Sequence, residues 1–300
     1  MENDRVDLET LVDMNNPHAI FTEAKRIVTH THPQFRFDLV ERTYEDVRRL
    51  FRGDYPGFRA CNTKYHDLRH TMLVVLAMMR LLDGAIIEQE RFTEKEVNIA
   101  LVSALMHDTG YIQPNEDTAG TGAKYTLIHI ARSIDFMKHY FSEDGYMKHD
   151  LPLFTDILNC TGVNTKISEI KFHSRNIELI GKMMGTADLL GQMADRLYLE
   201  RLIFLYHEFV EGNVPGFVSE IDMLKKTICF YDDTKKRFVT ELGSVYKYMI
   251  FHFQQRWNIA RDLYTEAILS NITYLNFILK DHETDFMDYL RRGGIVQALA

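Results

Sequence analysis

Apolar residues recur along most of the chain at intervals of three and four positions. Residues 18–29 and 37–51 show this spacing near the N-terminus, as in Leu39, Val40 and Tyr44. Such spacing predicts amphipathic helices. No segment sustains the alternation of a strand, and no repeat period appears. The pattern therefore predicts an all-α fold.

Two central segments, residues 68–82 and 97–107, are apolar on almost every side. A helix of this kind is expected to be buried, so the two segments predict the helices of the core. Thr93 to Glu96 forms a capping-box sequence before the second segment, and Thr109-Gly110 follows it as a stop signal. We expect Gly84 to end the first helix.

The same spacing predicts seven further helices, with residues 112–122 as a polar loop suited to a rim or lid. They span about residues 123–141, 150–159, 175–190, a segment reaching about 211, 219–242, 245–257 and 258–280. No linker-like stretch divides the chain, so residues 1–300 are predicted to form a single domain. The aromatic residues of the last helices suit either a homodimer interface or completion of the core.

Composition and charge exclude several classes of protein. The net charge of −8 argues against nucleic-acid binding through a basic surface. Cys61, Cys160 and Cys229 are odd in number and far apart, which predicts no disulfide framework and favours a reducing cytoplasm. The apolar runs 72–79 and 99–106 are too short to span a bilayer. We expect a cytoplasmic protein that binds neither nucleic acid nor membrane.

Candidate chemistry is concentrated in the stretch from Tyr65 to Thr71. If Asp67 opens a helix, His66 and His70, four residues apart, lie on one side near its start. His107-Asp108 ends a buried apolar helix, where a histidine and a carboxylate need a polar partner. Histidine and carboxylate ligands suit borderline divalent metals such as zinc, manganese, iron or cobalt, with magnesium at a carboxylate-rich position.

These residues carry a resemblance to a known family. His70, His107-Asp108 and Asp188, in this order, resemble the H…HD…D signature of the HD superfamily of metal-dependent phosphohydrolases. Tyr65 to His70 resembles the Tyr-His-Asn-x-x-His motif of the cyclic-nucleotide phosphodiesterase catalytic domain, and Thr186 to Leu189 resembles its distal Ala-Asp-Leu. The resemblance covers about residues 40–215 and leaves 216–300 as a C-terminal helical extension.

The resemblance implies a set of site residues and a reaction. His70, His107, Asp108 and Asp188 would hold a first metal, with Asp108 bridging to a second, and His66 would be the general acid. One or two divalent ions per chain, of Mg, Mn, Zn or Fe, are implied. The implied reaction is attack of a metal-bound hydroxide on a small nucleotide-like phosphoester. A diester is favoured over a monoester because an alkoxide leaving group needs a proton.

The chain also departs from the phosphodiesterase motif. That motif continues as His-Asp-x-Asp-His, whereas His107-Asp108 is followed here by Thr109-Gly110-Tyr111. Asp67 replaces the usual asparagine, and no glutamine is recognisable as the purine clamp.

Further charged residues are weaker candidates. His129 is either a second metal ligand or a structural histidine, and Lys124, with Arg132 beside it, is a candidate phosphate-binding residue. Asp195 is expected in a surface ion pair with Arg196 or Arg201. Six histidines are expected to be structural: His139, His149, His173, His207, His252 and His282.

Two other functions stay open. The first is an HD-type diiron oxygenase, whose extra ligands would be His129 and one of His139, His149 or His173. The second is an inactive nucleotide-binding signalling module that retains the fold.

Overall fold

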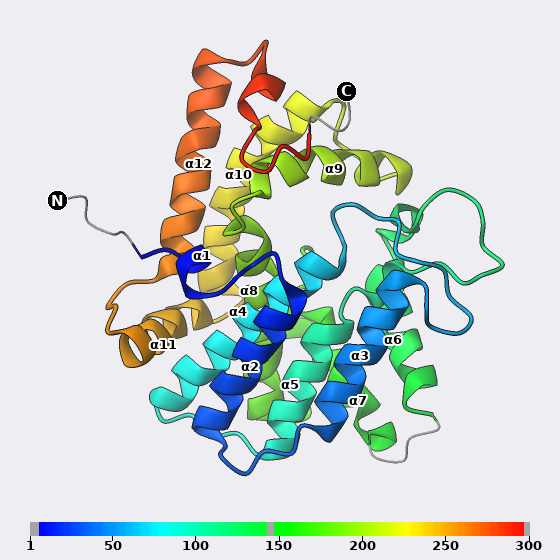
Figure 1. Ribbon diagram of the computed structural model, residues 1–300, viewed down its shortest axis with the longest axis vertical. Helices are drawn as coiled ribbons and strands as arrows, with labels where there is room; N and C mark the ends of the chain where they lie inside the picture. Colours follow the sequence, from blue (N-terminus) through cyan, green and yellow to red (C-terminus); the bar gives the residue numbers. More distant parts are fainter. Residues whose placement is uncertain (1–5, 143–146, 297–300) are drawn as a thin grey trace.

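The computed structural model describes residues 6–142 and 147–296, and these are helical with no strand (Figure 1). The helices are α1 (Leu8–Leu11), α2 (Pro17–Thr31), α3 (Asp38–Arg52), α4 (Leu68–Ile87), α5 (Glu94–Met106), α6 (His129–Tyr140), α7 (Leu151–Asn159), α8 (Arg175–Met193), α9 (Tyr198–Glu211), α10 (Glu220–Thr240), α11 (Tyr248–Trp257) and α12 (Leu263–Asp281). Short 3-10 turns lie between them, including η1 (Thr109–Tyr111), η2 (Gly122–Tyr125), η3 (Lys148–Asp150) and η5 (Val245–Lys247). The all-α prediction is confirmed.

Helix α4 lies at the centre of the fold and packs against α2, α5, α8 and α11. It is 20 residues long, and by length and hydropathy it could cross a membrane, but 89% of its most apolar window is buried inside the protein. A core position explains an apolar surface on every side. α4 is therefore the core helix that the sequence predicted.

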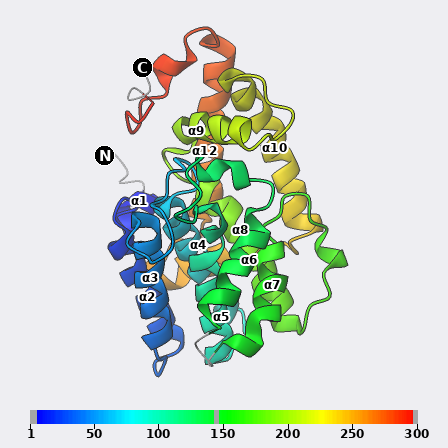
Figure 2. The same ribbon diagram turned by 90° about the vertical axis from the view of Figure 1, so that its right-hand side faces the viewer.

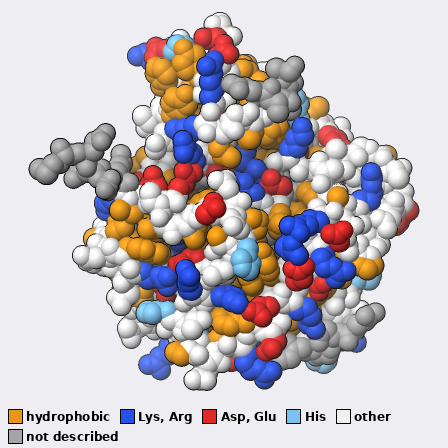
Figure 3. All heavy atoms as spheres, in the orientation of Figure 1, with side chains coloured by type: hydrophobic (Ala, Val, Ile, Leu, Met, Phe, Trp, Pro, Cys, Tyr) orange, Lys and Arg blue, Asp and Glu red, His pale blue; other side chains and the backbone are white. Residues whose placement is uncertain are grey.

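Different helices form the two ends of the molecule. Figures 1 and 2 both place α9, α10 and α12 at one end and α2, α3, α5 and α7 toward the other. Buried apolar residues from Leu8 to Val296 form one continuous cluster, so the C-terminal helices share the core with the others. On the face shown in Figure 3, basic and acidic side chains are interspersed with apolar ones.

Three predicted helix starts are confirmed by their caps. The Asp67 carboxylate accepts from the His70 amide at 2.9 Å at the start of α4. Thr93 and Glu96 form the predicted capping box of α5, and Ser174 caps α8 by accepting from the Ile177 amide. These side chains satisfy amide groups that have no partner within the helix.

Gly84 does not end α4, which continues to Ile87, so that prediction is wrong. A Cβ atom at residue 84 would lie 1.9 Å from the carbonyl oxygen of Tyr248. The glycine thus allows the start of α11 to approach α4. The presence of glycine at position 84 is explained by this tertiary contact and not by a helix stop.

Two predicted helices, expected from residues 123 and 258, begin only at His129 and Leu263. Residues 122–125 form η2, and α6 begins only at His129, because Thr121, Thr126 and His129 bond to nearby backbone groups instead of continuing a helix. Asn258 ends α11 in the left-handed conformation, and Asp262 caps α12.

Candidate metal centre

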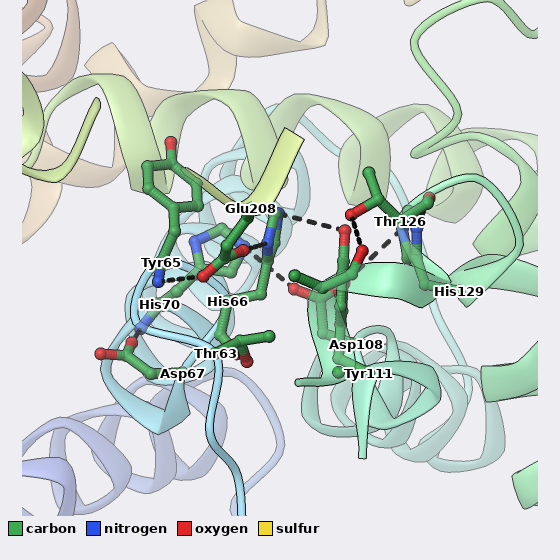
Figure 4. A network of polar contacts seen from close by, with 12 residues as sticks. Thr63, Tyr65, His66, Asp67, His70, Asp108, Tyr111, Thr126, His129 and Glu208 are labelled. Atoms are coloured by element: carbon green, nitrogen blue, oxygen red, sulfur yellow. Dashed lines mark hydrogen bonds and ion pairs between the residues drawn. The ribbon is translucent and has the colours of Figure 1, made fainter. Parts of the chain in front are cut away.

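Four elements bring the predicted metal ligands together. His70 lies in the first turn of α4, His107 and Asp108 follow the end of α5, and Asp188 lies on α8. His129 is the first residue of α6. Figure 4 shows His70, Asp108 and His129 around a common centre.

The donor atoms have the separations expected of ligands of one ion. His70 Nε2 lies 3.3 Å from Asp108 Oδ2, 3.2 Å from Asp188 Oδ1 and 3.4 Å from His107 Nε2. His107 Nε2 lies 3.2 Å from Asp108 Oδ2 and 3.9 Å from Asp188 Oδ1. Two donors that are each about 2.1 Å from one ion lie about 3.0 to 3.4 Å apart at angles of 90° to 109°. The compact set is His70, His107 and Asp108, and Asp188 extends it.

Hydrogen bonding leaves these atoms free for a cation. His107 Nδ1 lies 2.9 Å from the carbonyl oxygen of Ala104, which can only accept, so Nδ1 carries the proton of the neutral ring and Nε2 presents a lone pair. When neither His70 Nε2 nor His107 Nε2 carries a proton, the buried Asp108 Oδ2 has no hydrogen-bond donor among the described residues. Lone pairs converging in a buried site fit a divalent ion.

The electrostatics show an excess of negative charge. Burial by itself lowers the pKa of His70, but hydrogen bonds and charge from Asp108 and Asp188 outweigh it and raise the pKa to about 10. The pKa of His107 is raised against burial by the same two carboxylates. Burial raises the pKa of Asp108, yet His107 and His70 hold it well below its usual range. A cation bound by these residues would therefore replace protons held on the histidines.

His129 faces the other oxygen of the Asp108 carboxylate. Its Nε2 lies 3.8 Å from Asp108 Oδ1, while its Nδ1 lies 2.6 Å from the carbonyl oxygen of Thr126. Burial lowers the pKa of His129, which favours the neutral ring with a free Nε2. Asp108 therefore has one carboxylate oxygen beside His70 and His107 and the other facing His129.

His66 lies beside this centre and outside α4, just before the capping residue Asp67. Its Nδ1 lies 2.6 Å from Glu208 Oε2, and Glu208 Oε1 accepts from the Tyr65 amide at 2.6 Å. The Tyr111 ring stacks on the His66 ring with centroids 4.2 Å apart and planes 10° apart. Because the two rings are nearly parallel, the 3.5 Å contact between Tyr111 Oη and His66 Nε2 approaches the face of the imidazole.

Buried ion pairs hold the Tyr65-to-His70 stretch in place. Arg201 donates to both oxygens of Asp67, at 3.1 and 3.0 Å, and to the carbonyl oxygen of Tyr65. Arg69 donates to both oxygens of Asp195, at 2.6 and 3.2 Å.

Asp195 had been expected in a surface ion pair with Arg196 or Arg201, and this expectation is wrong. Its side chain is only 3% exposed, and its partner is Arg69. The chain bends after α8, which turns Asp195 back toward the start of α4, and spacing along a helix cannot reveal such a contact.

The candidate phosphate-binding residues have partners of their own. Lys124 Nζ lies 2.5 Å from both Asp117 Oδ1 and the carbonyl oxygen of Ala119. Arg132 donates to the carbonyl oxygens of Gly110 and Ile112 at 2.7 and 3.0 Å. Both side chains hold the 112–122 loop and η1 in place, and the phosphate-binding role of Lys124 stays a prediction.

The histidines expected to be structural lie outside the compact cluster. His139 is three turns beyond His129 on α6, about 15 Å along the axis, and its Nδ1 contacts the carbonyl oxygen of Asp135. His173 pairs with Asp156, His252 with Asp83, His207 with Glu220 and His282 with Asp285. His149 is an exposed residue of η3.

Sequence reasoning missed two residues of the site, Glu208 and Tyr111. Glu208 is 142 positions from His66, so no motif spacing links them. The available signal is its position on α9, where it follows Phe204 and Leu205 on the buried side of the helix. Tyr111 had been noted only as a departure from the motif.

Comparison with known proteins identifies a family. A family model described as Npun_R2479-like matches residues 56–271, more than half of the chain, and this segment contains every residue of the centre described above. No curated protein and no solved structure matches the chain. The description of the family names no activity, so the function has to be argued from the site. The chain belongs to the Npun_R2479-like family.

Proposed function

We propose that this protein is a metal-dependent phosphohydrolase that cleaves a phosphodiester bond of a nucleotide-like compound, with His66 as general acid. The observation that carries the proposal is the His66–Glu208 pair, 2.6 Å long, beside the donor set of His70, His107, Asp108 and Asp188. The resemblance to the HD superfamily and to the phosphodiesterase catalytic domain supports it.

The donor set indicates which group it would hold. His70, His107, Asp108 and Asp188 would hold one divalent ion, and Asp108 with His129 would hold a second. Bound ions would lower the pKa of a water molecule and neutralise phosphoryl oxygens. Two imidazoles and two carboxylates suit Zn, Mn or Fe, and Mg would be favoured where carboxylates and water dominate.

His66 can move the proton that the leaving group requires. The Glu208 carboxylate holds Nδ1–H and stabilises the charge of the protonated ring, so Nε2–H is the transferable proton. In hydrolysis, a water oxygen forms the new bond to phosphorus and the bond to the leaving alkoxide breaks. The alkoxide takes the proton from Nε2, the water's proton passes to solvent, and solvent reprotonates His66.

The basic side chains around the motif favour a substrate of low charge. Lys124 and Arg132 bond to the loop and η1, while Arg69 and Arg201 pair with Asp195 and Asp67. Within the described part of the chain, these four cations are already engaged. Substrate charge would then be met by bound ions and neutral donors, which suits a singly charged diester better than a polyphosphate.

The test is elemental analysis of the purified protein beside His70→Ala and His139→Ala variants, followed by assay of bis-p-nitrophenyl phosphate with each metal restored. We expect bound metal and hydrolysis in the wild type, loss of both with His70→Ala, and retention of both with His139→Ala, which removes an exposed histidine of α6. Metal-replete wild type that turns over no cyclic nucleotide, nucleotide or generic phosphodiester would overturn the proposal.

The other two hypotheses give different results in the same assays. Two irons per chain with oxygen consumption and no hydrolysis would replace the proposal with the diiron oxygenase. Binding of metal and nucleotide without any turnover would replace it with the signalling module. Full hydrolysis with Mg or Mn under anaerobic conditions would exclude the oxygenase.

A further inference from the structure

The segment that departs from the phosphodiesterase motif places Tyr111 against two histidine rings beside the centre, and the centroids of these two rings, His66 and His129, are 6.2 Å apart. Tyr111, which is 2% exposed, stacks on His66 with centroids 4.2 Å apart and planes 10° apart. It also stacks on His129, with centroids 4.7 Å apart and planes 20° apart. Figure 4 shows Tyr111 next to both histidines. Tyr111 occupies the place of the second histidine in the motif.

Gly110, at the place of the motif's aspartate, fixes the position of this stack. A Cβ atom at residue 110 would lie 2.0 Å from the carbonyl oxygen of His129, so an aspartate would not fit. The Gly110 amide donates to Ser133 Oγ at 2.9 Å, and Ser133 Oγ donates to the carbonyl oxygen of His107 at 2.6 Å. η1 is therefore held tightly against the start of α6, and Tyr111 is held with it.

Two of the contacts of the His66 ring bear on its orientation, besides the edge contact of Tyr65 with centroids 4.9 Å apart. Glu208 holds its Nδ1 edge at 2.6 Å, and Tyr111 covers one face. A carboxylate on one edge leaves the ring free to tilt about that hydrogen bond, and a stacked ring on the face removes the tilt. The hydroxyl of Tyr111 is itself held by a hydrogen bond with Thr126. Together these contacts set the direction of His66 Nε2.

We propose that Tyr111 is a positioning residue that acts through His66, and that its ring directs Nε2 toward the leaving group of the substrate. Thr109-Gly110-Tyr111 thus replaces the motif's polar pair with an aromatic support for the acid. The inference rests on the proposed function, in which His66 is the general acid. It assigns Tyr111 neither a metal nor a proton.

A pair of substrates that differ only in the leaving group tests this role. Thymidine 5′-(p-nitrophenyl phosphate) loses an aryl oxide that needs little protonation, whereas a thymidine dinucleotide loses an alkoxide that needs a proton. General acid catalysis contributes about 10²- to 10⁴-fold. With Tyr111→Leu, we expect kcat to fall about 30-fold for the dinucleotide and less than about threefold for the aryl ester.

Matched variants separate positioning from folding. Tyr111→Phe keeps the stack and should stay within about threefold of wild type on both substrates. Tyr111→Met is a second truncation, with a flexible side chain of similar volume, in case Tyr111→Leu does not fold. The His66→Ala/Tyr111→Leu double variant should be no slower than His66→Ala, because residues that act as one unit are not additive.

A measurement on the metal-free protein tests the stack without catalysis. Ring currents from Tyr111 should shift the ring-proton NMR signals of His66 and His129 upfield, in wild type and Tyr111→Phe but not in Tyr111→Leu or Tyr111→Met. Unshifted signals in wild type, equal losses on both substrates, unchanged rates in the truncations, or additive losses in the double variant would each overturn the inference. Wild type that hydrolyses neither of these substrates, and no cyclic nucleotide, nucleotide or generic phosphodiester, would overturn the proposed function, and the NMR comparison would still decide whether the stack exists.

Discussion

Helix α4 carries two buried clusters of histidine and aspartate with opposite behaviour. At its start, His70 meets Asp108 and Asp188, and the pKa of His70 is raised to about 10. Near its other end, Asp83 accepts a 2.6 Å hydrogen bond from His252, and the pKa of His252 is lowered to about 4. Both histidines are almost fully buried. Residue type and burial therefore do not distinguish the two sites.

The difference lies in the balance of charge. Burial is the largest of the effects that lower the pKa of His252. Arg80 and Arg256 lower this pKa further, and the single carboxylate of Asp83 opposes them. His70 faces two carboxylates, and its pKa is raised despite burial. Among the described residues, the buried atoms without partners in the Arg80–Asp83–His252 cluster are both donors and acceptors, whereas in the candidate metal centre the atom without a partner is a carboxylate oxygen. A surplus of acceptors marks the site suited to a cation.

The largest effects are expected when one carboxylate is removed from each cluster. The two variants should differ in whether they lose metal binding or stability. Asp108→Asn should abolish metal binding and lower hydrolysis at least about a hundredfold, because loss of even an outer partner of a ligand costs about 10- to 100-fold. Asp83→Asn should leave the metal content unchanged and lower the free energy of unfolding by about 3 kcal/mol, since it breaks a buried pair. Elemental analysis and urea unfolding of both variants provide the measurements.

The opposite pattern would break the comparison. If Asp83→Asn lost metal, or Asp108→Asn kept it, charge surplus would not be what defines the centre.

The proposed general acid, His66, is paired with Glu208. Glu208→Gln should lower kcat for an alkyl phosphodiester about 30-fold, within the range for general acid catalysis, because the neutral amide no longer stabilises a protonated His66. The metal content should not change. Glu211→Gln is the matched control, since Glu211 lies one turn further along α9 and accepts from Thr121 Oγ1. Equal rates in the two variants would contradict the role of Glu208.

Sequence periodicity predicted the helices, and the family resemblance predicted the candidate metal ligands, for different reasons. Local spacing determines which residues share a helix face, so α4 and α5 could be read directly. His70, His107, Asp108 and Asp188 were found because a family order was recognisable, and their convergence was not derivable from spacing. Their mutual distances show that this order corresponds to a compact set of donors.

The missed features depend on contacts between distant segments. Gly84 is explained by Tyr248, Asp195 by Arg69, and Glu208 by His66. The His252–Asp83 pair joins residues 169 positions apart. Such pairs form only after the helices have packed, so a single sequence contains no local pattern for them.

The Arg80–Asp83–His252 cluster should make folding sensitive to acid. The unfolded chain binds a proton on His252 near pH 6.5, whereas the folded chain binds it only near pH 4. Stability is thus fully present above pH 6.5 and is lost as the pH falls toward 4, by about 2 kcal/mol between pH 7 and pH 5. Besides burial, the groups that shift the pKa of His252 are Asp83 and Arg80 of α4 and Arg256 of α11. His30 Nδ1 of α2 lies 3.9 Å from Asp83 Oδ1.

Urea unfolding of the metal-free protein at several pH values measures this loss. Between pH 7 and pH 5, the free energy of unfolding of wild type should fall by about 2 kcal/mol more than that of His252→Asn, because the variant has no group to titrate at this position. Identical pH dependence in the two proteins would show that His252 is not the acid-sensitive group.

The smallest effect is expected from the substitution of Lys124. This variant tests whether a side chain, and not only bound ions, neutralises the charge of the substrate. Lys124 is paired with Asp117 at 2.5 Å, and its side chain is 26% exposed. Partly exposed ion pairs contribute about 0 to 1 kcal/mol, so Lys124→Ala should change kcat/KM by less than about threefold and leave the metal content unchanged. A rise in KM comparable to the kcat loss of Glu208→Gln would instead assign phosphate binding to Lys124. In that case a side chain, and not the bound ions alone, would neutralise the substrate, and a more highly charged substrate would become the better fit.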